Sequence, residues 1–262
     1  MMKFLLKYVV ELTGNRYSSL FLKSFAQSRL SKPLIRPFAK TYSINLDEAE
    51  YPIGHYQSLH DFFTRRLNEQ VHTIDESVHT LVSPADALLS DMGPISEKQT
   101  FYIKDQLYFL DEMLGSKENA KSYENGFFLI LYLSPRDYHR FHYPITGQLT
   151  KRYALGEKSY PVNTLGTRYG QSPFSTNYRV ISELTSTFGK LAMIKIGALN
   201  INSIQLTHSG SEFNKGEELG YFSFGSTILL LVEPNRSFKP LLKANTTVRV
   251  GQPIGEWADY SL

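Results

Sequence analysis

The sequence predicts an α+β protein, in which a helical N-terminal appendage is attached to a mainly antiparallel β domain. Residues 1–72 carry apolar side chains at helix-like spacings. After about residue 80 the pattern changes, and short runs rich in β-branched and aromatic residues alternate with Gly, Asn and Ser turns. We therefore divide the 262 residues into a helical region, 1–72, and a β-rich domain, 73–262.

The helical region contains one clear helix start. In "SLHDFFTRRLNEQ", Ser58 is followed three residues later by Asp61, which is a capping-box pattern ahead of the apolar pair Phe62-Phe63. A serine at this position satisfies backbone N–H groups that the first helical turn leaves without partners. We therefore expect a helix that begins directly after Ser58.

The first forty residues are basic and amphipathic. They carry eight Lys and Arg side chains and a single acid, Glu11, whereas the whole chain has a net charge of only +3. Phe and Leu residues lie between these charges at helix-like spacings, which suits the surface of an anionic membrane. A helical hairpin packed on the domain, with solvated charges, explains the pattern equally well. Nucleic acid is a poorer partner, because aromatic stacking platforms in a strand-rich groove are missing.

The composition excludes several kinds of site. The chain has no cysteine, so disulfides, thiolate metal ligands and a cysteine nucleophile are not available. The longest apolar run, Phe127–Leu133, is far shorter than the roughly 20 residues that a membrane-spanning helix needs. Lys3, Lys7 and Glu11 interrupt the apolar start of the sequence, which makes it a poor signal peptide. We expect a cytoplasmic protein, unless a membrane surface holds it.

The β-rich domain contains a series of short strand-like runs and one helix-like insert. The insert, "YFLDEMLGS", ends at Gly115, as a helix with a glycine C-cap does. The strand-like runs are Leu81–Val82, Phe101–Ile103, Gly126–Leu133, Tyr178–Ile181, Leu191–Ile196, Ile201–Leu206 and Tyr221–Val232.

A faint internal repeat lies near the C-terminus. "KGEELGYF" (Lys215–Phe222) and "VGQPIGEW" (Val250–Trp257) share two glycines at the same spacing before an aromatic residue. The glycines allow a tight turn and a bulge before the strand begins. Two copies predict paired hairpins related by pseudo-symmetry, as in small sandwich-like or barrel-like domains.

Two polar clusters interrupt the apolar sequence in the first half of the β-rich domain. Asp86 lies in "LVSPADALLSDMG", where Pro84 and Ala85 indicate a turn, and an Asp in a turn is usually structural. The segment "LYLSPRDYHRFHYPITG" contains His139 and His142, which are neighbours on a helical turn but lie on opposite faces of a strand. A His-x-x-His pair without further ligands at a telling spacing is a weak metal signal, so we expect no metal.

A third cluster lies inside an apolar stretch. "GYFSFGSTILLLVE", Gly220–Glu233, reads as one buried strand, with Ser226 on its apolar face directly after Gly225. A bulge with bonded hydroxyls is the ordinary explanation. As a nucleophile the serine needs a base and an orienting group, and Asp86 and one of the two histidines would supply them. The strand–elbow–helix setting of hydrolases is missing, so the serine is better placed to attack its own backbone.

These blocks resemble the phosphatidylserine decarboxylases, a family of pyruvoyl-dependent enzymes that are made as proenzymes. The resemblance extends from about residue 80 to the C-terminus, and the N-terminal helices and the chain length are similar to those of the short bacterial members. The blocks follow one another in the family's order: "SPAD" (Ser83–Asp86), "YLSPRDYHRFHYPITG" (Tyr132–Gly147), "YPVN" (Tyr160–Asn163), "IGALNINSI" (Ile196–Ile204) and "KGEELGYFSFGST" (Lys215–Thr227).

The resemblance implies that the chain cleaves itself between Gly225 and Ser226. The Ser226 hydroxyl would attack the Gly225 carbonyl, and elimination and hydrolysis would leave a pyruvoyl group, the cofactor, at the start of a small chain, 226–262, that stays with the large chain, 1–225. In the family the Asp and the second His of these motifs act with the serine, which here implies a triad of Asp86, His142 and Ser226. Asp86 would orient the imidazole, and His142 would take the serine proton.

The implied reaction is the decarboxylation of phosphatidylserine to phosphatidylethanolamine and CO2 through a Schiff base on the pyruvoyl group. His142 is our candidate proton donor, and His139 and Tyr138 are candidates for substrate binding. The choice between His139 and His142 as the base stays open. A lipid substrate also makes residues 1–40 the expected peripheral contact with the cytoplasmic side of the cell membrane, and a homo-oligomer is compatible with the sequence.

Two alternatives and one departure from the family pattern accompany this hypothesis. The alternatives are a serine hydrolase that uses the same Asp86, His142 and Ser226, and a non-enzymatic module that binds anionic lipid. The departure is Ala87, which follows Asp86 where the family usually has glycine. If that position requires a positive φ, alanine costs about 1 kcal/mol there. We expect self-cleavage to be retained.

Overall fold

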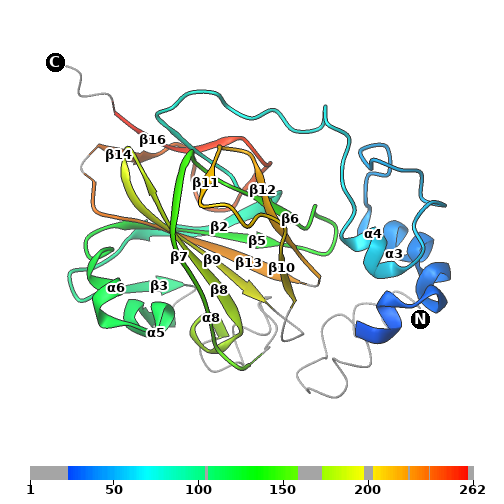
Figure 1. Cartoon of the computed structure of the whole chain (residues 1–262), viewed down its shortest axis with the longest axis horizontal. Helices are drawn as coiled ribbons and strands as arrows, with labels where there is room; N and C mark the ends of the chain where they lie inside the picture. The colour runs from blue at the N-terminus through cyan, green and yellow to red at the C-terminus, as the bar shows by residue number, and fades with distance from the viewer. Residues whose placement is uncertain are drawn as a thin grey trace.

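The computed structural model describes residues 23–103, 106–158, 173–197, 203–223, 225–235 and 237–258. Strands dominate this part of the chain and the helices in it are short, so the predicted α+β class is confirmed. Figure 1 shows the N-terminal helices on the right, to one side of the sheets. The predicted "YPVN" block lies outside the described residues. Residues 1–22, which are part of the basic segment 1–40, also lie outside them.

The described part of the helical region is built from short helices. Residues 23–27 are helical and are followed by η1 (Arg29–Leu34), α3 (Ile35–Tyr42) and α4 (Leu59–Phe63). The Ser58 hydroxyl accepts a hydrogen bond from the Asp61 backbone N–H at 3.1 Å, so the predicted cap of α4 is confirmed. The residues between α3 and α4 contain no helix, which makes the region less helical than the sequence predicts. Rings on α3 and α4, among them Phe38 and Phe62, pack edge to face and hold the two helices together.

The β-rich domain is centred on a large antiparallel sheet. In the described part of the chain its strands lie in the order β11 (Glu212–Phe213), β7 (Gly147–Leu155), β8 (Arg179–Ser186), β9 (Gly189–Gly197), β13 (Ser226–Val232), β5 (Phe127–Leu133), β2 (Ala87–Pro94) and β15 (Thr246–Val248). β13 is therefore a central strand, bonded to β9 on one side and β5 on the other, and every residue in it is buried.

Two three-stranded sheets are built around the glycine repeat. One has the order β1 (Thr80–Val82), β16 (Pro253–Trp257) and β14 (Phe238–Pro240), and the other has the order β10 (Ile204–Leu206), β12 (Glu218–Phe222) and β6 (Arg140–His142). Each copy of the repeat thus forms the middle strand of one small sheet, as the predicted pseudo-symmetry requires.

The first glycine of each repeat makes the predicted tight turn. Gly216 and Gly251 have φ values of +82° and +83°, a region that other residues rarely adopt. A Cβ on either would lie under 3 Å from the Ile74 side chain, so both turns pack against one residue of the loop that leads into β1.

The main sheet is covered on both faces. Alternation along β13 sends Ile228 and Leu230 into a core shared with the two small sheets, and sends Leu229 and Leu231 into a second core. The second core is closed by β3 (Thr100–Ile103), β4 (Gln106–Phe109), α5 (Leu110–Leu114), α6 (Lys117–Lys121) and α8 (Pro173–Thr176). α5 and α6 lie at the lower left in Figure 1, and β14 and β16 lie at the upper left. α5 ends at Gly115 with φ +69°, which confirms the predicted C-cap.

The prediction of one strand over Gly220–Glu233 is wrong. β12 ends at Phe222 and β13 begins at Ser226, and the two strands belong to different sheets. The apolar alternation continues across the break because Phe222 and Ile228 both face the same core, from opposite sides of it. The chain therefore changes sheets at the predicted cleavage site.

The structure contains no helix, among its described residues, that is long and apolar enough to cross a membrane.

Candidate functional site

Asp86 lies in the turn between β1 and β2, as the sequence predicts. Its Oδ1 accepts two hydrogen bonds, from His72 Nε2 at 2.8 Å and from the Val250 backbone N–H at 2.9 Å. These two bonds fix the carboxylate at the edge of the β-rich domain. Ala87, the first residue of β2, is not among the described residues with positive φ, so alanine carries no backbone strain there.

His142 is the last residue of β6 and is tied to the Asp86 turn. Its backbone N–H donates to the Pro84 carbonyl at 2.8 Å, and its Nδ1 donates to the Gly216 carbonyl at 2.8 Å. A carbonyl can only accept, so the hydrogen lies on Nδ1 and the lone pair of the neutral ring lies on Nε2. That Nε2 is buried and has no partner among the described residues. Burial lowers the pKa of His142, which keeps the ring neutral and able to act as a base.

Tyr138 joins these groups into one cluster with His72. Its ring centroid lies 5.3 Å from that of His72 and 5.9 Å from that of His142, and the side chain is buried. Burial lowers the pKa of His142 most strongly, and the charges of Glu218 and, to a smaller extent, Asp86 raise it. His72, Asp86, Tyr138 and His142 therefore form a connected cluster, which we call the Asp86 cluster.

His72 is a member of this cluster that sequence reasoning missed. It lies in the irregular segment between α4 and β1, where no periodicity or turn motif marks it. The hydrogen bond between His72 and Asp86 takes the position that the predicted triad assigns to His142, whose Nδ1 is held by Gly216 instead.

His139 is fully buried, on the chain just before β6. Its Nδ1 donates to the Asp137 carbonyl at 2.9 Å, and its Nε2 has no partner among the described residues. The ring packs on Phe63 of α4, with centroids 3.9 Å apart. Burial lowers the pKa of His139 to about 3, so this ring is also neutral with its lone pair on Nε2.

Ser226 begins β13, opposite Leu133 of β5 and Gly197 of β9. The residue is fully buried, and its Oγ has no hydrogen-bond partner among the described residues. A Cβ on Gly197 would lie 2.3 Å from Ser203 Oγ, so a larger residue there would require the Ser203 hydroxyl to move. A Cβ on Gly225 would meet no described atom within 4 Å other than those of its chain neighbours.

The structure brings Asp86, His142 and Tyr138 together and leaves Ser226 outside their described contacts. The described contacts of His142 are with Pro84, Gly216 and Tyr138, and none of them involves Ser226. The backbone of His139 contacts the end of β12, just before the predicted cleavage site, because its carbonyl accepts a hydrogen bond from Phe222 N at 2.8 Å. The complete triad stays a prediction.

Comparison with known proteins shows the family of the chain. The family model described as phosphatidylserine decarboxylase matches residues 59–256. The chain is 49% identical to a phosphatidylserine decarboxylase proenzyme of Geobacillus kaustophilus strain HTA426, over 99% of this chain and 98% of that protein. The chain belongs to the phosphatidylserine decarboxylase family. It is 45% identical to the corresponding proenzyme of Bacillus mycoides strain KBAB4, over 97% of this chain and 95% of that protein.

A phosphatidylserine decarboxylase of the predicted type carries a pyruvoyl group, and the residues around Ser226 fit one. A buried hydroxyl without a partner is rare in proteins; Ser226 Oγ has none among the described residues, and a Cβ on Gly225 would meet no described atom within 4 Å other than those of its chain neighbours. Among the described residues, no three His, Asp or Glu side chains lie together in a way that could hold a metal ion.

Proposed function

We propose that the protein converts phosphatidylserine to phosphatidylethanolamine and CO2, using a pyruvoyl group that it makes from Ser226. The observation that carries this proposal is the buried Ser226 hydroxyl, which lies directly after Gly225 and has no partner among the described residues of a chain of this family. Leaving a buried hydroxyl without a hydrogen bond costs about 1–3 kcal/mol. A reaction that consumes the hydroxyl gives a reason for accepting that cost.

In the proposed cleavage, Ser226 Oγ attacks the carbonyl carbon of Gly225 and the amide nitrogen leaves, so that an ester joins the two segments. Removal of the α-proton of Ser226 then breaks its Cβ–Oγ bond, which leaves a carboxylate on Gly225 and a dehydroalanine. Hydrolysis of the dehydroalanine releases ammonia and leaves the pyruvoyl group on the small chain, 226–262. The large chain is Met1–Gly225.

The base in this proposal is His142, and Asp86 supports it through charge. The lone pair of His142 lies on the buried Nε2, so the ring can accept a proton as the serine attacks. The carboxylates of Glu218 and, to a smaller extent, Asp86 favour the imidazolium that forms. His72 holds the carboxylate in place, and Val250 N–H supplies the second bond. His139, buried and neutral in the same way, is the alternative base.

When formed, the pyruvoyl group supplies a ketone that accepts the substrate amine and a carbonyl that withdraws electrons as CO2 leaves. The chain contributes the surroundings. Ile228 and Leu230, which share the sheet face of Ser226, keep water away from the reacting carbon. His142 returns a proton to that carbon, and Tyr138 and His139 position the substrate.

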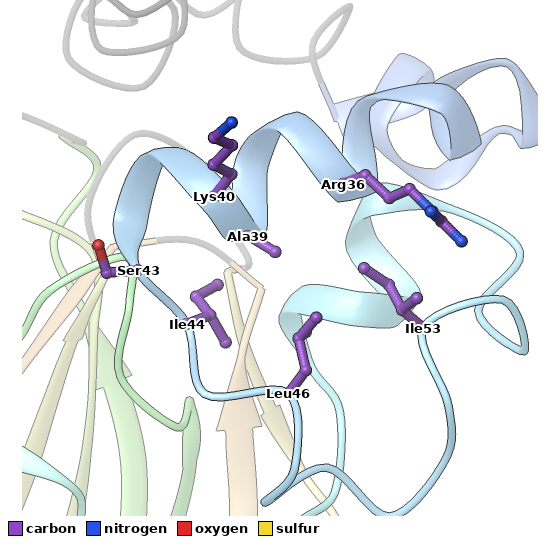
Figure 2. Close-up of a pocket in the computed structure, with 7 residues that line it drawn as sticks. All are labelled: Arg36, Ala39, Lys40, Ser43, Ile44, Leu46 and Ile53. Atoms are coloured by element: carbon purple, nitrogen blue, oxygen red, sulfur yellow. The ribbon is translucent and has the colours of Figure 1, made fainter.

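The lipid substrate also requires a membrane contact, which we assign to residues 1–40, as a peripheral contact on the cytoplasmic side of the cell membrane. α3 supports this assignment because Arg36 and Lys40 lie beside a pocket of about 410 Å³ with an apolar floor. Figure 2 shows Lys40 pointing away from Ile44 and Leu46, which lie on the other side of the helix. A basic edge next to apolar side chains suits anionic lipid.

A comparison of the full-length chain with its Ser226→Ala variant tests the proposal. On a denaturing gel we expect the natural chain to separate into two fragments, the smaller with the mass of residues 226–262 carrying pyruvoyl in place of serine. Ser226→Ala should stay intact and inactive. An intact, active chain labelled at Ser226 by a serine-reactive phosphonate would instead identify a serine hydrolase, and lipid binding without cleavage or turnover would identify a binding module.

A further inference from the structure

A small pocket opens next to the Asp86 cluster, between the helical region and the β-rich domain. It has a volume of about 230 Å³, and its lining includes Asp86 and Tyr138 from the cluster. Three arginines, Arg65, Arg136 and Arg249, also line it. The pocket therefore adjoins the Asp86 cluster, and its lining also holds three acids, Glu48, Asp86 and Asp137.

Arg65 is the arginine in this pocket that makes no ion pair with any described residue, although the charges of Asp86 and Glu48 reach it. Only 5% of the residue is exposed, and its Nε has no hydrogen-bond partner among the described residues. Its two remaining bonds, to the carbonyls of Phe62 and Arg136, are both 3.4 Å long, beyond the usual range for N–H···O. The guanidinium lies 5.0 Å from the centroid of the Phe62 ring, which holds it in place but offers no counter-charge.

The acids around the pocket are each paired with another residue. Glu48 bonds to Arg249 at 2.8 Å, and Asp86 bonds to His72 at 2.8 Å. Asp137 is 3.3 Å from Arg136. Arg65 has no ion pair within the described part of the chain. An uncompensated buried guanidinium is costly, and an anion with two oxygens in one plane would satisfy its donors.

We infer that this pocket binds the phosphodiester of the phospholipid head group, with Arg65 as its main ligand and Arg136 and Arg249 at the rim. The inference rests on the proposed function, which supplies the substrate. The carboxylate of phosphatidylserine is the less suitable ligand, because a cation on it would stabilise a charge that decarboxylation removes. The phosphodiester keeps its charge throughout the reaction, so Arg65 can hold it without raising the barrier.

The test uses the self-cleaved full-length enzyme and the variants Arg65→Gln and Arg65→Lys. The matched control is Arg66→Gln, because the Arg66 side chain is 59% exposed and does not line the pocket. We would measure kcat and KM for dihexanoylphosphatidylserine, and the inhibition constants of glycerophosphoethanolamine, serine and inorganic phosphate. Glycerophosphoethanolamine has the phosphodiester without the carboxylate, and serine has the carboxylate without the phosphodiester.

For Arg65→Gln we expect KM and the inhibition constant of glycerophosphoethanolamine to rise together by about 10- to 100-fold, with kcat and inhibition by serine little changed. Arg65→Lys, which keeps the charge but loses the forked donors, should show a smaller rise, and Arg66→Gln none. Because each variant is compared across inhibitors, partial loss of folded protein does not alter the ratio of its inhibition constants for glycerophosphoethanolamine and serine.

Three results would overturn the inference. The first is an unchanged KM in both Arg65 variants, and the second is a rise confined to the inhibition constant of serine. A change confined to inorganic phosphate, with KM for the lipid unaffected, would indicate a site for free phosphate. If the natural chain fails to decarboxylate phosphatidylserine, the proposed function fails. If the natural chain is active and the Arg65 variants have the same kinetic constants, this inference alone fails.

Discussion

Burial holds both imidazoles of the His139–His142 segment in their neutral forms, and backbone carbonyls fix which nitrogen carries the hydrogen. In each ring Nδ1 donates to a carbonyl, of Asp137 or Gly216, and Nε2 keeps its lone pair. Each ring can therefore accept a proton at a buried atom that has no partner among the described residues. Only substitution of each residue in turn can separate their roles.

We expect His142→Gln to slow the appearance of the two chains by about 10²- to 10⁴-fold, because glutamine cannot accept the serine proton. His139→Gln should still be cleaved, and should lose activity through a higher KM for phosphatidylserine. Quantitative gels over time and initial rates measure the two effects. His55→Gln, at an exposed position, is the control. The reverse pattern, with cleavage lost in His139→Gln alone, would make His139 the base.

Burial of His139 also predicts how stability depends on pH. The pKa of His139 is about 3 in the folded chain and about 6.5 in an unfolded one, so the unfolded state binds more protons between these values. The free energy of unfolding should therefore fall as the pH is lowered from about 6.5 toward 3. Between pH 7 and pH 5, the chain with His139 should lose on the order of 2 kcal/mol of unfolding free energy, and His139→Gln should remove that loss.

Urea unfolding of Ser226→Ala, with and without His139→Gln, measures this difference in a single uncleaved chain. Parallel stability curves for the two proteins between pH 7 and pH 5 would show that His139 is not held neutral by burial.

At the scale of elements, Gly197 of β9 leaves room for Ser203 beside the start of β13. Gly197 pairs with Ser226, and a Cβ there would lie 2.3 Å from Ser203 Oγ. Gly197→Ala should therefore force Ser203 to move, at a cost of about 1–3 kcal/mol, and should slow cleavage if that movement reaches Ser226.

Gly54→Ala is the matched control for this substitution, because a Cβ on Gly54 would meet no described atom within 4 Å. Denaturant unfolding of both variants in the Ser226→Ala chain gives the cost, and gels of the cleavable chain give the rate. Normal cleavage in a destabilised Gly197→Ala protein would separate the packing role of Gly197 from the reaction.

Elements with local signals were predicted well from the sequence. The Ser58 cap, the Gly115 C-cap and the glycine turns at Gly216 and Gly251 each depend on a few adjacent residues, and the structure has all of them. The turn that carries Asp86 was predicted for the same reason.

The break between β12 and β13 could not be predicted in this way. Phe222 and Ile228 face one core from two sheets, so apolar alternation looks continuous across it. His72 reaches Asp86 from an irregular segment, and Arg65 becomes buried through contacts with Phe62 and Arg136. Both placements depend on tertiary packing, which leaves no periodic pattern in the sequence.

At the scale of the whole molecule, the helical region completes the site and is more than an appendage. Phe63 of α4 packs on His139, and the Thr64 carbonyl accepts a hydrogen bond from Arg140 Nε at 3.0 Å. Arg65 and His72 supply charge and orientation to the pocket and to Asp86. The proposed boundary between residues 72 and 73 falls inside the irregular segment between α4 and β1, and the site extends across it. The helical region therefore carries both the proposed membrane contact and residues of the site.

The last prediction concerns that membrane contact. The double substitution Arg36→Glu and Lys40→Glu reverses two charges at the edge of the α3 pocket. Since a basic residue near an anionic surface contributes about 1 kcal/mol, we expect binding to vesicles of phosphatidylserine and phosphatidylcholine to fall at least about tenfold.

Cosedimentation of the Ser226→Ala chain measures this binding, and added salt should weaken the binding of the parent chain more than that of the double variant. The control is Lys239→Glu with Lys243→Glu, which makes the same change in net charge at exposed positions of the β-rich domain. If the control loses as much binding as the α3 variant, the attraction comes from the overall charge of the protein. If it keeps its binding, the lipid surface contacts the helical region, on the side where Figure 1 places α3.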